Sequence, residues 1–552
     1  MAVTAINGSL MRLEHRAERI DPTTLVETFV DVGPLFHLLN SGGHQVVYGR
    51  RGTGKTHALQ YLIAERRRTG DVAVYVDMRT IGSTGGIYGD QSIPLAERGT
   101  RLLMDALQAV HNELVDHALE VSYADDGRDA LSLLDGLADQ ITQVRVVGGD
   151  VERVTTVGEQ RGQESKREAG FDATLQGVGA RLGSSGTKSD QQHAEIVTRE
   201  TGHLRHRVHF GAVSQILGRI VGQLAPENRL WIVLDEWSDV PLDLQPLLAD
   251  LVRRALFPIR NIVVKIGAIE HRSRFQVLGA GGSYLGIELG ADASADVNLD
   301  DFMVFDYDAE KASEFFRDLF FKHVRATLAE EGRADEAPSR PEDLIRGGFT
   351  QANAFAELVR AAEGVPRDAM YIASYAAQAA MEGQISMNNV RTAARRWYLR
   401  DKEATLSDRG RALLNWIMDR VIRDRRTSAF FLEQGHGRTH PLIGTLYDQR
   451  VLHVKKRSVA TYVEPGVRYD VYGLDYGCFV ELTATARAPQ GMFEAEDTDG
   501  TVRYFDVPQD DYRSIRRAIL DISEFDRENP ELTASDLAEA EDSAVGDVKD
   551  TD

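Results

Sequence analysis

The stretch Gln45–Leu62 constrains the fold of this chain more than any other part of its sequence. It places a glycine-rich loop between the apolar run Val46–Tyr48 and a segment with the spacing of an amphipathic helix. The loop reads GRRGTGKT and fits the pattern G-x-x-x-x-G-K-S/T, in which backbone N–H groups and a helix N-terminus surround phosphate oxygens. The sequence therefore predicts a strand, a phosphate-binding loop and a helix, which together begin an α/β domain with a parallel sheet.

A second apolar run, Leu230–Leu234, ends in the carboxylates Asp235 and Glu236. Lys55 is predicted to reach the β- and γ-phosphates of ATP, while Thr56 and Asp235 would hold Mg. Glu236 would orient the attacking water, because phosphoryl transfer depends on positioning and charge neutralisation. The residues predicted to contact the nucleotide or its magnesium are Gly49, Arg50, Arg51, Gly52, Thr53, Gly54, Lys55, Thr56, His57 and Asp235.

Several charged residues have more than one interpretation. Arg50 and Arg51 would contact a partner subunit or face solvent. A strand predicted at Asn261–Ile269 should end near the γ-phosphate, so the next three residues are alternatives for a side chain that senses it. These alternatives are Glu270, His271 and Arg272. The arginines considered for reaching a neighbouring subunit's nucleotide, or for surface ion pairs, are Arg253, Arg254, Arg272 and Arg274.

The bulk composition excludes several classes of protein. Hydrophobic content of 42% and charged content of 27% are typical of globular domains. No apolar run reaches the roughly 18 residues that could span a bilayer, and the N-terminus lacks a signal-peptide core, so we expect a cytoplasmic protein without a membrane partner. The single cysteine, Cys478, excludes an intramolecular disulfide and lies in an apolar run that predicts a buried strand.

The phosphate loop, the strand ending in Asp235 and Glu236, and a helical region containing GVPRDAM (residues 364–370) together resemble the AAA+ P-loop ATPases. The similarity is greatest to their origin-recognition initiator (ORC/Cdc-type) branch and spans roughly residues 29–402. It implies an all-α lid after the parallel sheet, and it makes Arg367 the sensor 2 arginine that folds back onto the γ-phosphate. The chain departs from the family at sensor 1, and also in an insertion, Gly148–His193, which is interpreted as a projecting hairpin or a partly disordered loop.

Members of that branch often end in a winged-helix domain, and Leu406–Leu482 fits this pattern. Thr439–Gln449 is the predicted recognition helix, and two alternating runs after it supply the wing. Residues 391–458 carry 16 basic and 7 acidic side chains, a net charge of +9 within a chain of −21. The residues predicted to meet DNA phosphates are Arg438, Lys455, Lys456 and Arg457, with Arg425, Arg426 and Arg450 as further contacts. Winged helices also bind proteins, so a protein partner stays an alternative.

The expected domains are a lead-in at 1–20, an ATPase core at 21–302 with its 148–193 insertion, a lid at 303–403, a winged helix at 404–490 and an acidic tail at 491–552. The predicted function is an Mg-dependent ATPase switch with catalytic residues Lys55, Glu236 and Arg367. Its nucleotide state would control assembly, as a homo-oligomer or with a protein partner, and engagement of double-stranded DNA. The alternative is a signalling or defence-type NTPase scaffold that recruits a protein without binding DNA.

Overall fold

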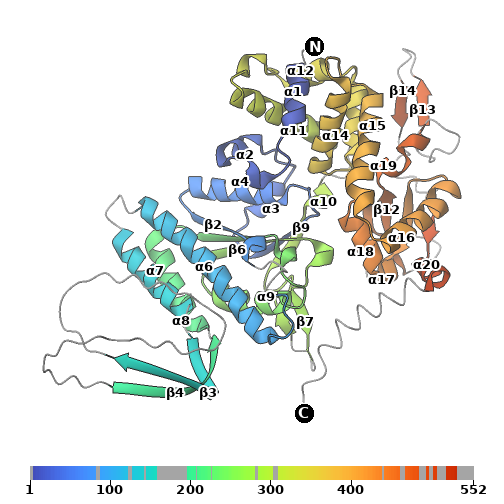
Figure 1. The fold of residues 1–552 in the computed structure, drawn as a ribbon. Coiled ribbons are helices and arrows are strands. Elements are labelled where there is room, and N and C mark those ends of the chain that lie inside the picture. The colour runs from blue at the N-terminus through green and yellow to red at the C-terminus, as the bar shows by residue number, and fades with distance from the viewer. Residues whose placement is uncertain are drawn as a thin grey trace, which may run out of the picture.

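The computed structural model describes residues 4–81, 88–121, 127–141, 144–157, 196–206, 208–225, 227–279, 284–302, 309–437, 440–460, 466–483, 493–496, 502–505 and 518–530. Within these ranges, Figure 1 shows a parallel sheet with its helices, a helical region and a C-terminal mixed sheet. No helix in the described ranges is long and apolar enough to cross a membrane.

A five-stranded parallel sheet of order β2-β5-β6-β1-β9 forms the centre of the N-terminal half. Its strands are β1 (Gln45–Tyr48), β2 (Val72–Asp77), β5 (Leu230–Asp235), β6 (Ile262–Ala268) and β9 (Ser294–Asn298). Strands β5 and β6 are buried throughout, as expected for parallel strands covered on both faces. Because the strands are parallel, the phosphate loop after β1 leaves the same edge of the sheet as Asp235 at the end of β5. The predicted α/β fold class is confirmed.

Helices cover both faces of this sheet and produce two apolar clusters. Alternate residues of β1 enter different clusters, with Val46 in one and Val47 in the other, as the two-residue period of a strand requires. The helices on the Val46 side are α6 (Leu95–Val121), α7 (Gly127–Ile141), α8 (Phe210–Leu224) and α9 (Gln245–Leu256). Those on the Val47 side are α3 (Leu35–Leu39) and α4 (Lys55–Arg68). Short helices α2 (Pro22–Thr28), α5 (Met78–Ile81) and α10 (Leu299–Phe302) connect these elements.

A helical region follows the sheet, as predicted for the lid. Its helices are α11 (Ala309–Glu330), α12 (Pro341–Gly348), α13 (Ala352–Ala361), α14 (Pro366–Ala380) and α15 (Met387–Trp397). The N-terminal helix α1 (Ala5–Arg12) packs against α14, and Leu10 lies in the apolar cluster of this region. Asn7 Nδ2 donates hydrogen bonds to the carbonyls of Met381 (2.8 Å) and Gly383 (2.9 Å). The segment expected to be a polar lead-in therefore forms a helix attached to the helical region.

The C-terminal part contains a four-stranded mixed sheet of order β11-β12-β10-β15. Its strands are β10 (Ala429–Glu433), β11 (Leu452–Ala460), β12 (Arg468–Leu474) and β15 (Ile519–Leu520), and its helices are α16 (Asp408–Met418), α17 (Gln434–Gly437), α18 (Pro441–Asp448), α19 (Tyr476–Phe479) and α20 (Ile522–Glu528). Strands β11 and β12 form an antiparallel hairpin where the wing is predicted, and α18 forms within the predicted recognition helix. Phe355 of the helical region and Tyr472 of this sheet lie in one apolar cluster, so the two parts share a core.

Three further segments bear on the sequence predictions. The insertion predicted at Gly148–His193 begins within β3 (Val144–Val157), and β4 (Ile196–His206) follows it. The two strands form an antiparallel pair that projects away from the sheet, as a hairpin would (Figure 1). Residues 158–195 lie outside the described residues. The strand predicted around Cys478 is wrong, because Tyr476–Phe479 is the helix α19, which begins where Asp475 accepts a hydrogen bond from the Gly477 N–H (3.0 Å). Two short pairs, β7 (Gln276–Leu278) with β8 (Tyr284–Gly286) and β13 (Phe493–Glu496) with β14 (Val502–Phe505), complete the strands.

Candidate functional site

The phosphate loop joins β1 to α4 through two glycines with left-handed backbone. Gly52 and Gly54 have φ angles of +93° and +90°, which glycine adopts without steric cost. A Cβ at Gly52 would also lie 2.9 Å from Arg367 Cβ, so glycine permits the close approach of the loop and α14. Gly54 is the N-cap of α4 and Lys55 is its first residue. The helix therefore begins at the loop, and its N-terminus favours an anion there.

Asp235 ends β5 with its side chain fully buried. Its Oδ2 accepts hydrogen bonds from the hydroxyls of Thr56 (2.7 Å) and Tyr75 (3.0 Å), and its Oδ1 accepts one from the Glu236 N–H (2.8 Å). On the neighbouring strand β6, a Cβ at Gly267 would lie 2.2 Å from Asp235 Oδ1. Thr56 and Asp235 thus bring a hydroxyl and a carboxylate together, and such oxygen ligands suit Mg²⁺. Motif spacing does not identify Tyr75 and Gly267, because their contact with Asp235 crosses between strands.

Glu236 follows Asp235 in a left-handed conformation, with φ +56°. A non-glycine residue in this region carries backbone strain, which proteins often retain at functional sites. Burial raises the pKa of Glu236, and nearby Lys55 opposes this shift while Asp235 adds to it. Arg79, which no sequence motif identifies, has its Nη1 atom 4.0 Å from Glu236 Oε1. The backbone therefore holds this carboxylate beside the start of α4 and within reach of a second cation.

A cavity of about 340 Å³ lies between the phosphate loop, the start of α14 and the N-terminal segment. The predicted site residues that line it include Lys55, Thr56, Glu236 and Arg367. The Arg367 N–H donates to the Gly52 carbonyl (3.2 Å), which attaches the start of α14 to the loop. The lining includes every predicted nucleotide contact except Gly49 and Asp235. The geometry thus places the predicted residues around one ligand-sized space, and their contact with ATP stays a prediction.

Another part of the cavity wall is formed by residues of which only His57 is predicted from the sequence. Its apolar side chains include Phe29, Leu319 and Met370, together with His15, His57 and His323. Burial lowers the pKa of all three histidines, to about 3 for His323, so the imidazoles are neutral near pH 7. The His57 Nε2 atom lies 2.7 Å from the Leu25 carbonyl oxygen. A neutral and largely apolar wall suits a flat heterocycle better than a charged group.

The three alternatives for phosphate sensing lie in one turn, η3 (Glu270–Arg272), which faces the C-terminal part. Arg272 Nε bonds Asp448 Oδ2 (2.9 Å), and the His271 ring packs edge-on against Tyr447 at 5.1 Å between centroids. Glu270 pairs with Arg457. None of the three lines the cavity. Their contacts place this turn at the junction between the five-stranded parallel sheet and the C-terminal part.

The structure describes Lys455, Lys456 and Arg457 among the four residues predicted to contact DNA, and Lys455 and Arg457 are paired with carboxylates. Lys455 pairs with Glu363, while Arg457 pairs with Glu270 (2.9 Å) and Asp301 (3.6 Å). Lys456 is half-buried, and Arg438 lies outside the described residues. Arg450, considered as a further contact, is buried and bonded to Asp368. Helix α18, within the predicted recognition helix, has its apolar residues buried and contacts η3 and α16.

The Arg50 side chain is buried within the chain, whereas the sequence suggested that it would contact a partner subunit or face solvent. This side chain is only 4% exposed, and its Nε atom bonds Asp300 Oδ1 at 2.6 Å. Its Nη1 donates to the Leu452 carbonyl (2.9 Å), and the guanidinium lies 4.3 Å from the Tyr447 ring centroid. Arg51 is half-exposed and pairs with Asp239 (3.2 Å) within the same chain. The side chain of Arg50 thus extends from the phosphate loop into the C-terminal part.

Comparisons with known proteins find two kinds of similarity. Residues 13–77, which include the phosphate loop and β2, match the family described as ORC-CDC6-like. No curated protein matches the chain. Cdc6p from Pyrobaculum aerophilum is similar over 84% of this chain and 97% of that chain, with 11% identity and a TM-score of 0.30. Orc1 from Aeropyrum pernix, solved in complex with DNA, is similar over 81% of this chain and 90% of that chain, with 15% identity and a TM-score of 0.29.

The family match covers β1, the phosphate loop, α4 and β2. It also covers His15 and Phe29 of the cavity wall. The segment that builds one side of the cavity is thus the segment that matches the family. This chain resembles the ORC-CDC6-like family, as its motifs predict, and residues 13–77 carry that resemblance.

Proposed function

We propose that this protein binds ATP with magnesium, hydrolyses it, and uses its nucleotide state to change the contacts of its C-terminal part. The observation that carries the proposal is the convergence of Lys55, Thr56, Glu236 and Arg367 on one cavity. These residues supply a cation for the phosphates, a hydroxyl for the metal, a carboxylate for water and a second cation from the helical region. No single one of them would indicate a nucleotide site, but phosphoryl transfer needs all four functions.

Each residue has a distinct part in the proposed chemistry. Thr56 and Asp235 would hold magnesium, which neutralises phosphate charge when it is bound. Lys55 binds the β- and γ-phosphates from the first turn of α4. Glu236 orients the attacking water, and its strained backbone fixes the direction of its carboxylate. Arg367 adds positive charge from α14, which is already attached to the loop through the Gly52 carbonyl.

Calorimetric titration of ATP and Mg into the full chain tests nucleotide binding. Lys55→Ala should lower the affinity by at least tenfold, about 1.4 kcal/mol, because it removes the cation nearest the phosphates. Arg68→Ala is the matched control, because this arginine lies at the other end of α4 with its side chain 72% exposed. Equal affinities for the wild type and Lys55→Ala would refute the proposed site.

The output that we propose is engagement of double-stranded DNA, together with assembly as a homo-oligomer or with a protein partner. The basic balance of residues 391–458 supports a polyanion contact. Lys455 and Arg457 are held by Glu363, Glu270 and Asp301, so phosphates would have to displace these carboxylates. Glu270→Gln should therefore strengthen DNA binding at low salt, because it frees Arg457 from its nearest carboxylate.

A second function, a switch that recruits a protein without binding DNA, is favoured by the burial of α18 and by the same ion pairs. A salt titration of DNA binding separates the two functions. Affinity that falls steeply with salt supports phosphate contacts, since each contact releases counterions. Absence of binding at low salt, in the wild type and in Glu270→Gln, would reject DNA as the partner and leave the protein-recruiting function.

A further inference from the structure

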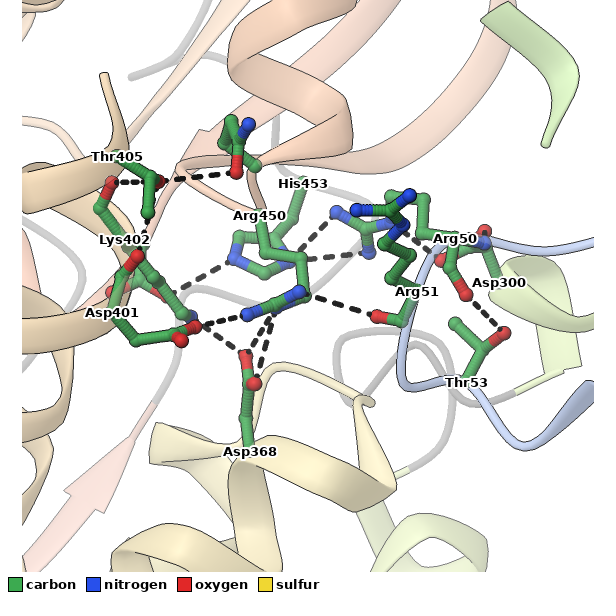
Figure 2. A network of polar contacts seen from close by, with 12 residues as sticks. Arg50, Arg51, Thr53, Asp300, Asp368, Asp401, Lys402, Thr405, Arg450 and His453 are labelled. Carbon is green, nitrogen blue, oxygen red and sulfur yellow. Dashed lines mark hydrogen bonds and ion pairs between the residues drawn. The ribbon is translucent and has the colours of Figure 1, made fainter. Parts of the chain in front are cut away.

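A ring of polar contacts joins the phosphate loop, the helical region and the C-terminal part (Figure 2). It starts at Arg50, whose Nη2 lies 3.4 Å from Nδ1 of His453 on β11. Burial lowers the pKa of His453 to about 3, so the ring is neutral and Nδ1 accepts from Arg50. The Nε2 atom then donates to Asp475 Oδ2 at 3.2 Å. This first arm connects the loop to the end of β12 through buried side chains only.

The second arm returns through the helical region. Asp475 and Asp368 share the ammonium of Lys402, with 2.8 Å between Lys402 Nζ and Asp368 Oδ2. Asp368 also bonds Arg450 Nε, at 3.1 Å from Oδ1. The Arg450 Nη1 donates to the Arg51 carbonyl at 3.4 Å. The ring therefore closes at Arg51, the neighbour of Arg50, where it began.

Burial makes this ring sensitive to small displacements. Asp368, Lys402 and Asp475 are each at most 2% exposed. In such an environment an ion pair is stable only while its partners remain in place, because an unpaired buried charge is costly. A shift of the loop or of α14 that separates one pair would therefore disturb the others.

Two adjacent residues connect the ring to the cavity. Arg367 lines the cavity, whereas its neighbour Asp368 is a member of the ring, and both lie in the first turn of α14. Arg50 and Arg51 belong to the phosphate loop, which lines the same cavity. A ligand that draws the loop and Arg367 together would thus move two separate points of the ring.

We propose that Arg50 is the positioning residue through which the C-terminal part senses whether the phosphate loop is occupied. This inference rests on the proposed nucleotide binding. Arg50 acts through its hydrogen bonds to the Leu452 carbonyl and to His453. Asp300 fixes the direction of the Arg50 side chain, because its carboxylate accepts hydrogen bonds from the Arg50 backbone N–H (2.9 Å) and from Arg50 Nε (2.6 Å). The coupling is reciprocal. If bound nucleotide changes the protein's affinity for a partner of the C-terminal part by some factor, that partner changes the protein's affinity for nucleotide by the same factor.

Hydrogen exchange of the β11 amides, with and without a non-hydrolysable ATP analogue, tests the coupling in the full chain. In the wild type, the analogue should change the exchange of residues 452–460 by about fivefold or more, the lower end of typical coupling. Arg50→Lys keeps a charge for Asp300 but loses the planar fork that reaches Leu452 and His453. At concentrations of the analogue that saturate each protein, Arg50→Lys should lose the response in β11.

Arg98→Lys is the matched control. Arg98 is also a buried arginine that bonds one carboxylate, Asp243 (2.7 Å), and two carbonyls, those of Tyr88 (2.8 Å) and Ile93 (3.1 Å). All of these partners precede the helical region, so this variant should keep the response. If Arg50→Lys does not fold, His453→Gln interrupts the same arm from the other side and should show the same loss.

The possible outcomes decide between the coupling and the proposed function. A wild type that binds no nucleotide rejects both. A wild type that binds nucleotide without any change in β11 rejects the coupling alone. A response that persists in Arg50→Lys also rejects the coupling. Loss of nucleotide binding in Arg50→Lys as complete as in Lys55→Ala would make Arg50 a ligand instead of a positioning residue.

Discussion

Replacing Lys402 with methionine should destabilise the C-terminal half of the protein severely. The Lys402 ammonium is 1% exposed and is shared between Asp368 and Asp475, which are equally inaccessible to water. Without it, Asp368 keeps Arg450, but Asp475 keeps only the neutral His453 and the Gly477 N–H. Removing one partner from a buried ion pair costs about 3–5 kcal/mol. Because Asp475 retains two hydrogen bonds, we expect a loss near the lower figure.

Urea denaturation followed by tryptophan fluorescence measures this loss, because Trp397 and Trp416 lie in the affected half. Arg423→Met is the control, since the Arg423–Asp419 pair is on the surface with side chains 76% and 53% exposed. Such a pair contributes less than about 1 kcal/mol. A Lys402→Met protein within about 1 kcal/mol of the wild type would refute the argument that this ammonium neutralises the two buried carboxylates.

The same variant should change the response to acid. Burial raises the pKa of Asp475, but Lys402 and His453 outweigh this and hold it below its usual value. A lowered carboxyl pKa gives stability that is present above the unfolded pKa and is lost as pH falls through the folded pKa. Lys402→Met should therefore lose less stability than the wild type on acidification below about pH 4. An identical acid dependence in both proteins would contradict this sign.

Two further predictions concern the sheet. Gly267→Ala places a Cβ 2.2 Å from Asp235 Oδ1, so the carboxylate must move away from Thr56 and ATP turnover should fall by about 100-fold. Gly218→Ala is the control and should have no effect, because the atom nearest to its added Cβ is 3.9 Å away. Normal turnover in Gly267→Ala would contradict this reasoning. Lys265 is buried on β6, and burial lowers its pKa to about 7, so between about pH 7 and 10 the unfolded chain holds one more proton than the folded chain. Raising the pH through this window should stabilise the wild type relative to Lys265→Met by a few kcal/mol in thermal unfolding, and a constant difference would show that Lys265 titrates normally.

The sequence predicts the parts of this site that lie close together along the chain. The loop from Gly49 to Thr56 and the pair Asp235–Glu236 are identified because each follows an apolar run and has a fixed spacing. Arg367 is identified from its position at a helix start within the family resemblance. The structure also places Tyr75 and Gly267 beside Asp235. The spacing of motifs along the chain cannot predict these contacts, because they join neighbouring strands.

The predictions from the sequence differ from the structure mainly at charged side chains, because the sequence does not show which partner each of them has. Lys455 and Arg457 are consecutive with Lys456 and suggest a phosphate contact, but their carboxylate partners are 92 and 187 residues away in the chain. Arg50 stands in a loop whose neighbours face the cavity, yet its own partners belong to the C-terminal part. The segment around Cys478 is apolar in a way that fits a buried strand or a buried helix, and only its N-cap at Asp475 distinguishes the two.

Single-turnover hydrolysis of ATP by the wild type and Glu236→Gln tests the central claim most directly. Glutamine keeps the shape of the side chain but cannot act as a carboxylate toward water. Glu236→Gln should bind ATP as tightly as the wild type and hydrolyse it at least about 100-fold more slowly. Equal hydrolysis rates in the two proteins, or no hydrolysis by the wild type, would contradict the central claim.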